Sequence, residues 1–206
     1  MWRLSRGNDA EKVMYERNRS FQESVDDKHI KEAGAVIGFD TSSWISSQRA
    51  KHLNRPYFLD QSIAHPREKD SIFSKLRQRY PQWAEDIPAK EHFMVQLEEA
   101  EYALAHRIVV ASSFTKNSLI KNGIAKDRII LNPYGVGGDF FRDRPIKKRE
   151  QKARFVYLGF LGARKGLPFL IETWMEHQLY NNSELWLAGP ATDFAKAAIG
   201  STPGMT

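Results

Sequence analysis

The segment FVYLGFLGARKGLPFLIETW, residues 155–174, reads as a short strand, a glycine-rich loop and an amphipathic helix. Its helical part carries apolar residues at the i, i+3, i+4 and i+7 spacing of one buried helix face, namely Leu167, Leu170, Ile171 and Trp174. Pro168 lies in the first turn, where its missing N–H group has no intrahelical partner to lose. SELWLAGP, residues 183–190, is another apolar run of strand length. The order strand, helix, strand is therefore expected here.

The same alternation of short apolar runs and amphipathic stretches continues along the rest of the chain. Strands are predicted at 35–44, 56–66, 107–112, 127–136, 153–159 and 183–190. Helices are predicted at 8–33, 46–54, 67–88, 89–106, 114–122, 167–178 and 191–200. The helix at 67–88 is interrupted at Pro81 and Pro88, and the helix at 114–122 has Ser112 or Ser113 as its cap. This alternation is typical of parallel sheets with helices on both faces. We therefore predict the α/β class, with two Rossmann-like units.

A change of composition divides the chain into two parts. Residues 137–153, GGDFFRDRPIKKREQKA, begin with two glycines and are then highly charged. Such a stretch is typical of a linker between folded units. We predict a first domain at 1–138, a linker at 139–152 and a second domain at 153–206.

The overall composition is that of an ordinary globular protein, with 41% hydrophobic and 27% charged residues among 206. The absence of cysteine excludes disulfides and thiolate metal sites and favours a cytoplasmic protein. No apolar run approaches the roughly 20 residues that cross a bilayer, and the N-terminal residues lack the apolar stretch of a signal peptide. The net charge of +6 attracts phosphorylated substrates, anionic lipid at a membrane surface or nucleic acid, without choosing among them.

The loop GFLGARKG, residues 159–166, combines three glycines with two cations where a strand leads into a helix. Glycines let backbone N–H groups approach a ligand, and a cation there suits a phosphate. The loop contains neither GK[ST] nor GxGxxG, so it is not a Walker A or a dinucleotide-binding motif. The residues alone leave two alternatives open, an anion-binding cradle and an ordinary surface turn with solvated charges.

Several motifs in their order along the chain resemble family 4 (group 1) glycosyltransferases. The similarity is carried by RIVVASSFTKNSLIKNGIAKDRIILNPYGV at 107–136, by FVYLGFLGARKGLPFLIETW at 155–174 and by LWLAGP at 185–190, and it extends over about residues 33–195. The family has the GT-B fold, in which two Rossmann-like domains face each other across a cleft. The resemblance implies retaining transfer of a sugar from a nucleotide-diphosphate sugar to an acceptor of unknown identity.

The resemblance also implies a site for the donor diphosphate in the second domain. Lys165 matches the family lysine that contacts the diphosphate, and Gly159 and Gly162 form the backbone cradle. The family normally has an arginine where this chain has Phe160. Either Arg164 supplies the second cation from its neighbouring position, since a guanidinium can donate several hydrogen bonds to phosphate oxygens, or binding of the diphosphate is weakened. No metal or other cofactor is expected, since the two cations neutralise the leaving group.

In the first domain, the family has a histidine at the end of a strand that reaches the transferred sugar. His65, in SIAHP, matches that residue and is the expected catalytic residue. An isolated loop histidine without a catalytic role is the alternative. The family also has an aspartate after its Pro-x-Gly-Val turn, where this chain has Gly137 and offers Asp139 two residues later.

Two family features have no counterpart, and both concern the ends of the sequence. The opening strand with its glycine-rich loop is not found before residue 33, and no matching Glu-x7-Glu stretch follows the second domain's early part. We therefore expect two incomplete GT-B units with little or no transferase activity, and self-association or a second chain to cover their exposed sheets. A non-catalytic module that binds a nucleotide or a phosphorylated partner is the alternative. Peripheral membrane contact is left open, and nucleic acid ranks last as a partner.

Overall fold

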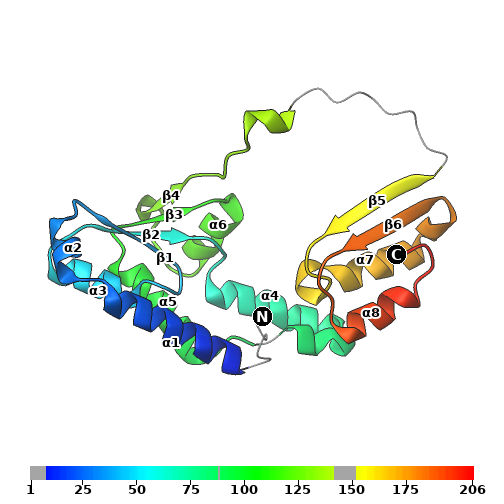
Figure 1. Ribbon diagram of the computed structural model, residues 1–206, viewed down its shortest axis with the longest axis horizontal. Helices are drawn as coiled ribbons and strands as arrows, with labels where there is room; N and C mark the ends of the chain where they lie inside the picture. Colours follow the sequence, from blue (N-terminus) through cyan, green and yellow to red (C-terminus); the bar gives the residue numbers. More distant parts are fainter. Residues whose placement is uncertain (1–7, 88, 142–151) are drawn as a thin grey trace. The chain divides into compact units, whose positions relative to one another are not determined.

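The computed structural model describes residues 8–87, 89–141 and 152–206, which form two compact units. Unit 1 consists of Met1–Ile72 and Ala89–Val136, and unit 2 of Phe73–Pro88 and Gly137–Thr206. Each unit has its own parallel sheet and its own helices (Figure 1). The expected α/β class with parallel, Rossmann-like sheets is thereby confirmed.

The sheet of unit 1 has four parallel strands in the order β1-β2-β3-β4. Their bounds are Val36–Phe39 for β1, Tyr57–Gln61 for β2, Arg107–Val110 for β3 and Ile129–Leu131 for β4. One row of paired residues crosses the whole sheet, from Gly38 through Leu59 and Ile108 to Ile129. Leu59 and Ile108 are fully buried, so this row lies on the face that is covered by helices. The first and last strands are shorter than the predicted runs at 35–44 and 127–136.

Helices of unit 1 pack around an apolar core that includes Leu59, Tyr102, Ile108 and Leu119. Their bounds are Asn8–Ser24 for α1, Asp27–Glu32 for α2, Trp44–His52 for α3, His92–Leu104 for α5 and Ser113–Lys121 for α6, with a 3-10 turn η2 at Lys126–Arg128. The single helix predicted at 8–33 is two helices, because the carboxylate of Asp26 accepts the Lys28 N–H (2.8 Å) and caps α2. The predicted cap of α6 is confirmed at Ser112, whose Oγ accepts the Thr115 N–H (3.1 Å).

The sheet of unit 2 pairs β5, Ala153–Leu158, with β6, Ser183–Ala188, in parallel. Its helices are α7, Leu167–Glu176, and α8, Asp193–Gly200, and its 3-10 turns are η1 at Pro81–Asp86, η3 at Gly138–Phe141, η4 at Ala163–Lys165 and η5 at Leu179–Asn181. Leu167 of α7 and Ala195 of α8 are fully buried in one apolar core with the strands. Past α8, Met205 forms a parallel bridge with Leu185, beside β6.

Residues 73–88 pack with unit 2, although the sequence analysis placed them in a first domain at 1–138. Helix α4, Pro66–Arg79, begins in unit 1, and from Phe73 on the chain belongs to unit 2 until unit 1 resumes at Ala89. Trp83 and Ile87 are 4% and 1% exposed and contribute to the core of unit 2. Burial of these two apolar side chains is the physical reason for the assignment. Most of the predicted linker, residues 142–151, lies outside the described residues.

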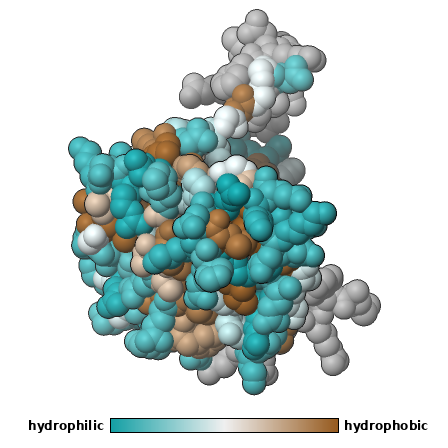
Figure 2. All heavy atoms as spheres, turned by 90° about the vertical axis from the view of Figure 1, so that its left-hand side faces the viewer, coloured by the Kyte–Doolittle hydropathy of each residue, from teal (hydrophilic) through white to brown (hydrophobic). Residues whose placement is uncertain are grey.

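Apolar side chains are also exposed on the surface of unit 1. Ile37 and Phe39 of the edge strand β1 are 71% and 61% exposed. On the face drawn in Figure 2, apolar groups are interrupted by hydrophilic side chains. Self-association to cover the sheet therefore stays a prediction. In the part of the chain that the structure describes, no helix has the length and apolar character needed to cross a membrane.

Candidate functional site

The glycine-rich loop follows the carboxyl end of β5 and runs beside the loop that follows β6. The N–H of Gly159 donates to the Ala188 carbonyl (2.9 Å), and the N–H of Leu161 donates to the Pro190 carbonyl (2.8 Å). Gly159 has a φ of 140°, a conformation that residues with a side chain rarely adopt. The loop therefore has a fixed position at the edge of the sheet where ligands bind in doubly wound folds.

Gly189, in the neighbouring loop, makes this close approach of the two loops possible. Its φ is 152°, and a Cβ atom added to it would lie 1.8 Å from the carbonyl oxygen of Gly159. No side chain fits at that distance. Sequence reasoning quoted this residue within LWLAGP and gave it no role, because the clash arises only when the two loops meet.

The middle of the loop turns sharply and leads into α7. Gly162 is buried against the ring of Phe160, and its N–H donates to the Phe160 carbonyl (3.1 Å). Gly166, with a φ of 84°, precedes α7, and its N–H donates to the Ala163 carbonyl (2.9 Å). The hydroxyl of Tyr157 donates to the Phe160 carbonyl (3.0 Å) and braces the turn. The N–H groups of Gly159 and Gly162, expected as the cradle, thus already have acceptors within the chain.

Arg164 and Lys165 are the two cations of this loop, and both are exposed. Neither side chain has a hydrogen-bond or ion-pair partner within residues 8–87, 89–141 and 152–206. Burial raises the pKa of the Tyr157 phenol, and the positive charge of Arg164 partly offsets this rise. The guanidinium of Arg164 therefore lies close enough to the Tyr157 phenol to influence its pKa. Two adjacent cations without a counter-ion in the described part of the chain can neutralise an anion that binds there.

An acidic side chain that sequence reasoning missed contacts the same loop. The carboxylate of Asp86 lies against Gly162, and burial raises its pKa, a rise that the nearby backbone amide of Ala163 partly offsets. Its Oδ2 is buried without a hydrogen-bond partner in the described part of the chain, and lies 3.4 Å from the point where a Cβ on Gly162 would stand. An internal carboxylate thus lies against the candidate anion site.

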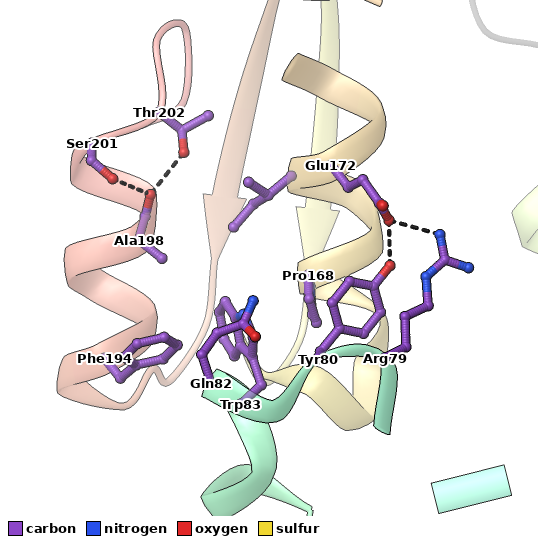
Figure 3. A pocket seen from close by; sticks show the side chains of 11 residues that line it. Arg79, Tyr80, Gln82, Trp83, Pro168, Glu172, Phe194, Ala198, Ser201 and Thr202 are labelled. Carbon is purple, nitrogen blue, oxygen red and sulfur yellow. Dashed lines mark hydrogen bonds and ion pairs between the residues drawn. The ribbon is translucent and has the colours of Figure 1, made fainter. Parts of the chain in front are cut away.

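In unit 2, residues of α7, of α8 and of the segment 79–83 line a groove (Figure 3). It encloses about 470 Å³, and Trp83 meets Phe194 edge to face with ring centroids 4.8 Å apart. Glu172 accepts hydrogen bonds from the Tyr80 hydroxyl and from Arg79 (2.9 Å). These contacts fix η1 against the two helices. The apolar residue types at Trp83 and Ile87 are the sequence signal that could have indicated this packing. A charged segment that is surrounded by solvent would not be expected to carry them.

His65 lies in unit 1 and is 2% exposed. Its backbone N–H donates to Ser118 Oγ (3.0 Å), its Nδ1 accepts the Arg67 N–H (3.3 Å), and its Nε2 is 3.9 Å from Glu99 Oε1. The ring packs against Tyr102 with centroids 5.2 Å apart. Burial lowers the pKa of His65, opposed by the charge of Glu99, so the imidazole is neutral at neutral pH. Its expected contact with a sugar stays a prediction, and the four loop residues lie in unit 2.

A second carboxylate satisfies backbone amides beyond β1 of unit 1. Glu101 is fully buried, and its two oxygens accept the N–H groups of Thr41 (2.9 Å) and Ser43 (2.8 Å). The Ser43 hydroxyl, which also contacts the Tyr57 hydroxyl (2.6 Å), lies 3.1 Å from the same carboxylate. Burial raises the pKa of Glu101 to about 7, even though these three donors favour its charged form.

A buried ion pair lies in the same unit. Lys90 contacts Glu98, and their side chains are 9% and 0% exposed. Burial, helped by the charge of Lys69, lowers the pKa of Lys90 to about 8. The charges of Asp40 and Glu101 act in the opposite direction on this ammonium group. Sequence reasoning assigned no role to these charges, because their burial depends on the surrounding tertiary packing.

Within the described residues, no group of three His, Cys, Asp or Glu side chains is arranged to hold a metal ion. The expectation that catalysis needs no metal stays a prediction. No protein-family model matches this chain, and no curated protein matches it. The resemblance to family 4 glycosyltransferases therefore stays a prediction from the sequence motifs.

Proposed function

We propose that this chain is a glycosyltransferase of the retaining class, with little or no transferase activity by itself, whose unit 2 binds the diphosphate of a nucleotide-sugar at residues 159–166. The observation that carries the proposal is the pair of exposed cations, Arg164 and Lys165, on a glycine-rich loop between β5 and α7. Neither cation has a counter-ion among the described residues. In Rossmann-like units, this edge of a parallel sheet is where phosphates bind.

The chemistry assigned to these residues is stabilisation of the leaving diphosphate. When the bond between the sugar and the diphosphate breaks, negative charge accumulates on the leaving oxygen. Fixed cations beside that oxygen then contribute more in the transition state than in the ground state, which accelerates the reaction. Lys165 acts as a point charge, and Arg164 donates a fork of hydrogen bonds. The acceptor and the sugar are not assigned.

A second candidate function is a non-catalytic module that binds a nucleotide or a phosphorylated partner through the same loop. The burial of His65 favours it, because a side chain that is 2% exposed offers little surface to a sugar. Both candidates share the phosphate-binding step and differ only in turnover. The binding step can therefore be tested first.

Calorimetric titration with UDP, GDP and ADP tests the binding step. We expect at least one of them to bind the wild-type chain, and Lys165→Ala to weaken binding about tenfold or more, because one charge-assisted contact is lost. Lys152→Ala is the matched control, since it removes an exposed lysine that directly precedes the opposite end of β5. Equal affinities of wild type and Lys165→Ala, or no binding at all, would contradict the proposal.

Turnover separates the two candidates once binding has been measured. Release of the nucleotide diphosphate from a nucleotide-sugar, with and without an acceptor mixture, is followed for the wild-type chain. Release that depends on Lys165 supports the transferase. Binding without release supports the non-catalytic module.

A further inference from the structure

The sheet of unit 1 carries its helices on one face. Its strands follow one another in the order β1-β2-β3-β4, without the reversal of direction that doubly wound sheets show. Crossovers between parallel strands are right-handed, so a sheet that grows in one direction receives its crossover helices on the same face. The core under that face joins Leu59 and Ile108 to Ile30 of α2 and Leu119 of α6. Among the described residues, this core contains no side chain from the opposite face of the sheet.

The opposite face of this sheet is mainly apolar and lies open. Ile37 and Phe39 of β1 are 71% and 61% exposed, and Ile130 of β4 is 44% exposed. Parallel sheets normally bury both faces, so exposure of this kind indicates a surface that is covered by a partner. We call this surface the open face. The register arranges it in two rows across the sheet, Ile37, Phe58 and Arg107 in one and Phe39, Asp60, Val109 and Ile130 in the other.

Two side chains of opposite charge lie among these apolar ones, on the two central strands. Asp60 belongs to β2 and Arg107 to β3, in neighbouring rows. Both are half-buried, and neither has an ion-pair partner in the part of the chain that the structure describes. The guanidinium of Arg107 donates to the His106 carbonyl (2.9 Å), which carries no full charge. Because half-buried charges have lost part of their hydration, a surface that brings the opposite charge to each of them is favoured.

We propose that the open face binds the open face of a second copy of this chain across a two-fold axis. The same surface then serves both copies, and each charge on it finds its opposite on the partner. An axis parallel to the sheets, midway between Asp60 and Arg107, brings the carboxylate of each copy onto the guanidinium of the other. Two ion pairs form at the centre, and the surrounding apolar side chains are removed from water. This inference does not depend on nucleotide binding by unit 2.

The size of the open face sets the expected strength of the dimer. At about 3.3 Å per residue and about 4.8 Å between strands, four strands of about four residues cover roughly 13 by 19 Å. This contact is smaller than a standard protein interface. We therefore expect a reversible dimer with a dissociation constant in the micromolar range, and not a permanent one.

Sedimentation velocity of the full chain, from about 5 µM to about 500 µM, tests this contact. Wild type should form a dimer as its concentration rises. Asp60→Lys and Arg107→Glu each place like charges opposite one another, so each should weaken the dimer about tenfold or more. The double variant Asp60→Lys/Arg107→Glu restores opposite charges and should dimerise as wild type does. Lys51→Glu is the matched control, because it reverses a charge at an exposed position of α3, away from the open face, and it should leave the dimer unchanged.

Circular dichroism melting establishes that each variant is folded. Arg107→Gln, which removes one charge, replaces a single variant that unfolds, and it should weaken the dimer by a smaller factor. Wild type that stays monomeric over the whole range overturns the proposal, as does a dimer that both charge reversals leave unchanged. A folded double variant that stays monomeric also overturns it, since the two charges then do not face each other. Equal weakening by Lys51→Glu and Arg107→Glu overturns it as well, because the effect is then one of net charge.

Discussion

The buried carboxylate of Glu101 makes the stability of unit 1 depend on pH in a defined direction. In the unfolded chain this group titrates near 4.5, and in the folded chain burial raises its pKa to about 7. Between these values the folded chain keeps a proton that the unfolded chain has released. The free energy of unfolding therefore falls as the pH rises from about 4.5 to about 7, and becomes constant above that.

The size of this effect follows from the two pKa values. The interval from 4.5 to about 7, at about 1.4 kcal/mol per pH unit, amounts to about 3 kcal/mol. Because Glu101 is fully buried, solvent screening does not reduce this value much. The N–H groups of Thr41 and Ser43 favour the carboxylate, so without them the loss of stability would be larger.

Glu101→Gln provides the reference, because its side chain has a similar shape and does not titrate. Hydrogen exchange of the backbone amides of β2 and β3, read by mass spectrometry, reports the opening of unit 1 alone. Wild type and variant are compared at the same pH, so the intrinsic exchange rates cancel. The variant loses a constant amount of stability, since its amide can accept only one of the two N–H bonds. We expect the stability of wild type relative to the variant to fall by about 3 kcal/mol from pH 4.5 to pH 7. A difference that stays constant within about 0.5 kcal/mol over this range would refute the reasoning.

Three further predictions concern packing. Gly189→Ala should destabilise unit 2 by about 2 kcal/mol or more, seen as a lower urea midpoint, because its Cβ would lie 1.8 Å from the Gly159 carbonyl oxygen. Gly200→Ala, at a position with open space around it, should have little effect. Trp83→Ala should destabilise unit 2 by about 3–5 kcal/mol in urea unfolding, since this side chain is 4% exposed, and an unchanged midpoint would contradict the assigned packing of residues 73–88. Phe39→Asp should reduce self-association in sedimentation velocity experiments if the exposed sheet of unit 1 mediates it, whereas equal sedimentation of both proteins at all concentrations would exclude that surface.

Much of the fold was predictable because its signals are local. The helix face of Leu167, Leu170, Ile171 and Trp174 and the early proline at 168 predicted a helix that the structure places at Leu167–Glu176. A cap at Ser112 or Ser113 was predictable, and Ser112 is the residue that forms it, because its side chain bonds a backbone group only three residues away. Pro81 was recognised as an interruption, and α4 ends at Arg79. Each of these features depends on neighbours within one or two turns of the chain.

The candidate site was predictable only in part. Glycine spacing and the cations Arg164 and Lys165 identified the loop, since residue type and order are enough to suggest a place for phosphate. Its actual hydrogen bonding was not predictable, because the carbonyl that accepts the Gly159 N–H belongs to Ala188, in another strand. The roles of Asp86 and Gly189 depend on contacts of the same long-range kind.

The sequence by itself determined the alternation of strands and helices, the class of the fold and the position of the glycine-rich loop, because periodicity, caps and turn residues act over a few positions. Only the tertiary structure decided that residues 73–88 pack with unit 2, that Asp86 lies against Gly162 of the loop and that His65 is buried. These outcomes depend on which apolar and charged groups meet across many residues of chain. Burial and pairing of that kind leave no local pattern, and they decide which groups of the loop stay open to a ligand.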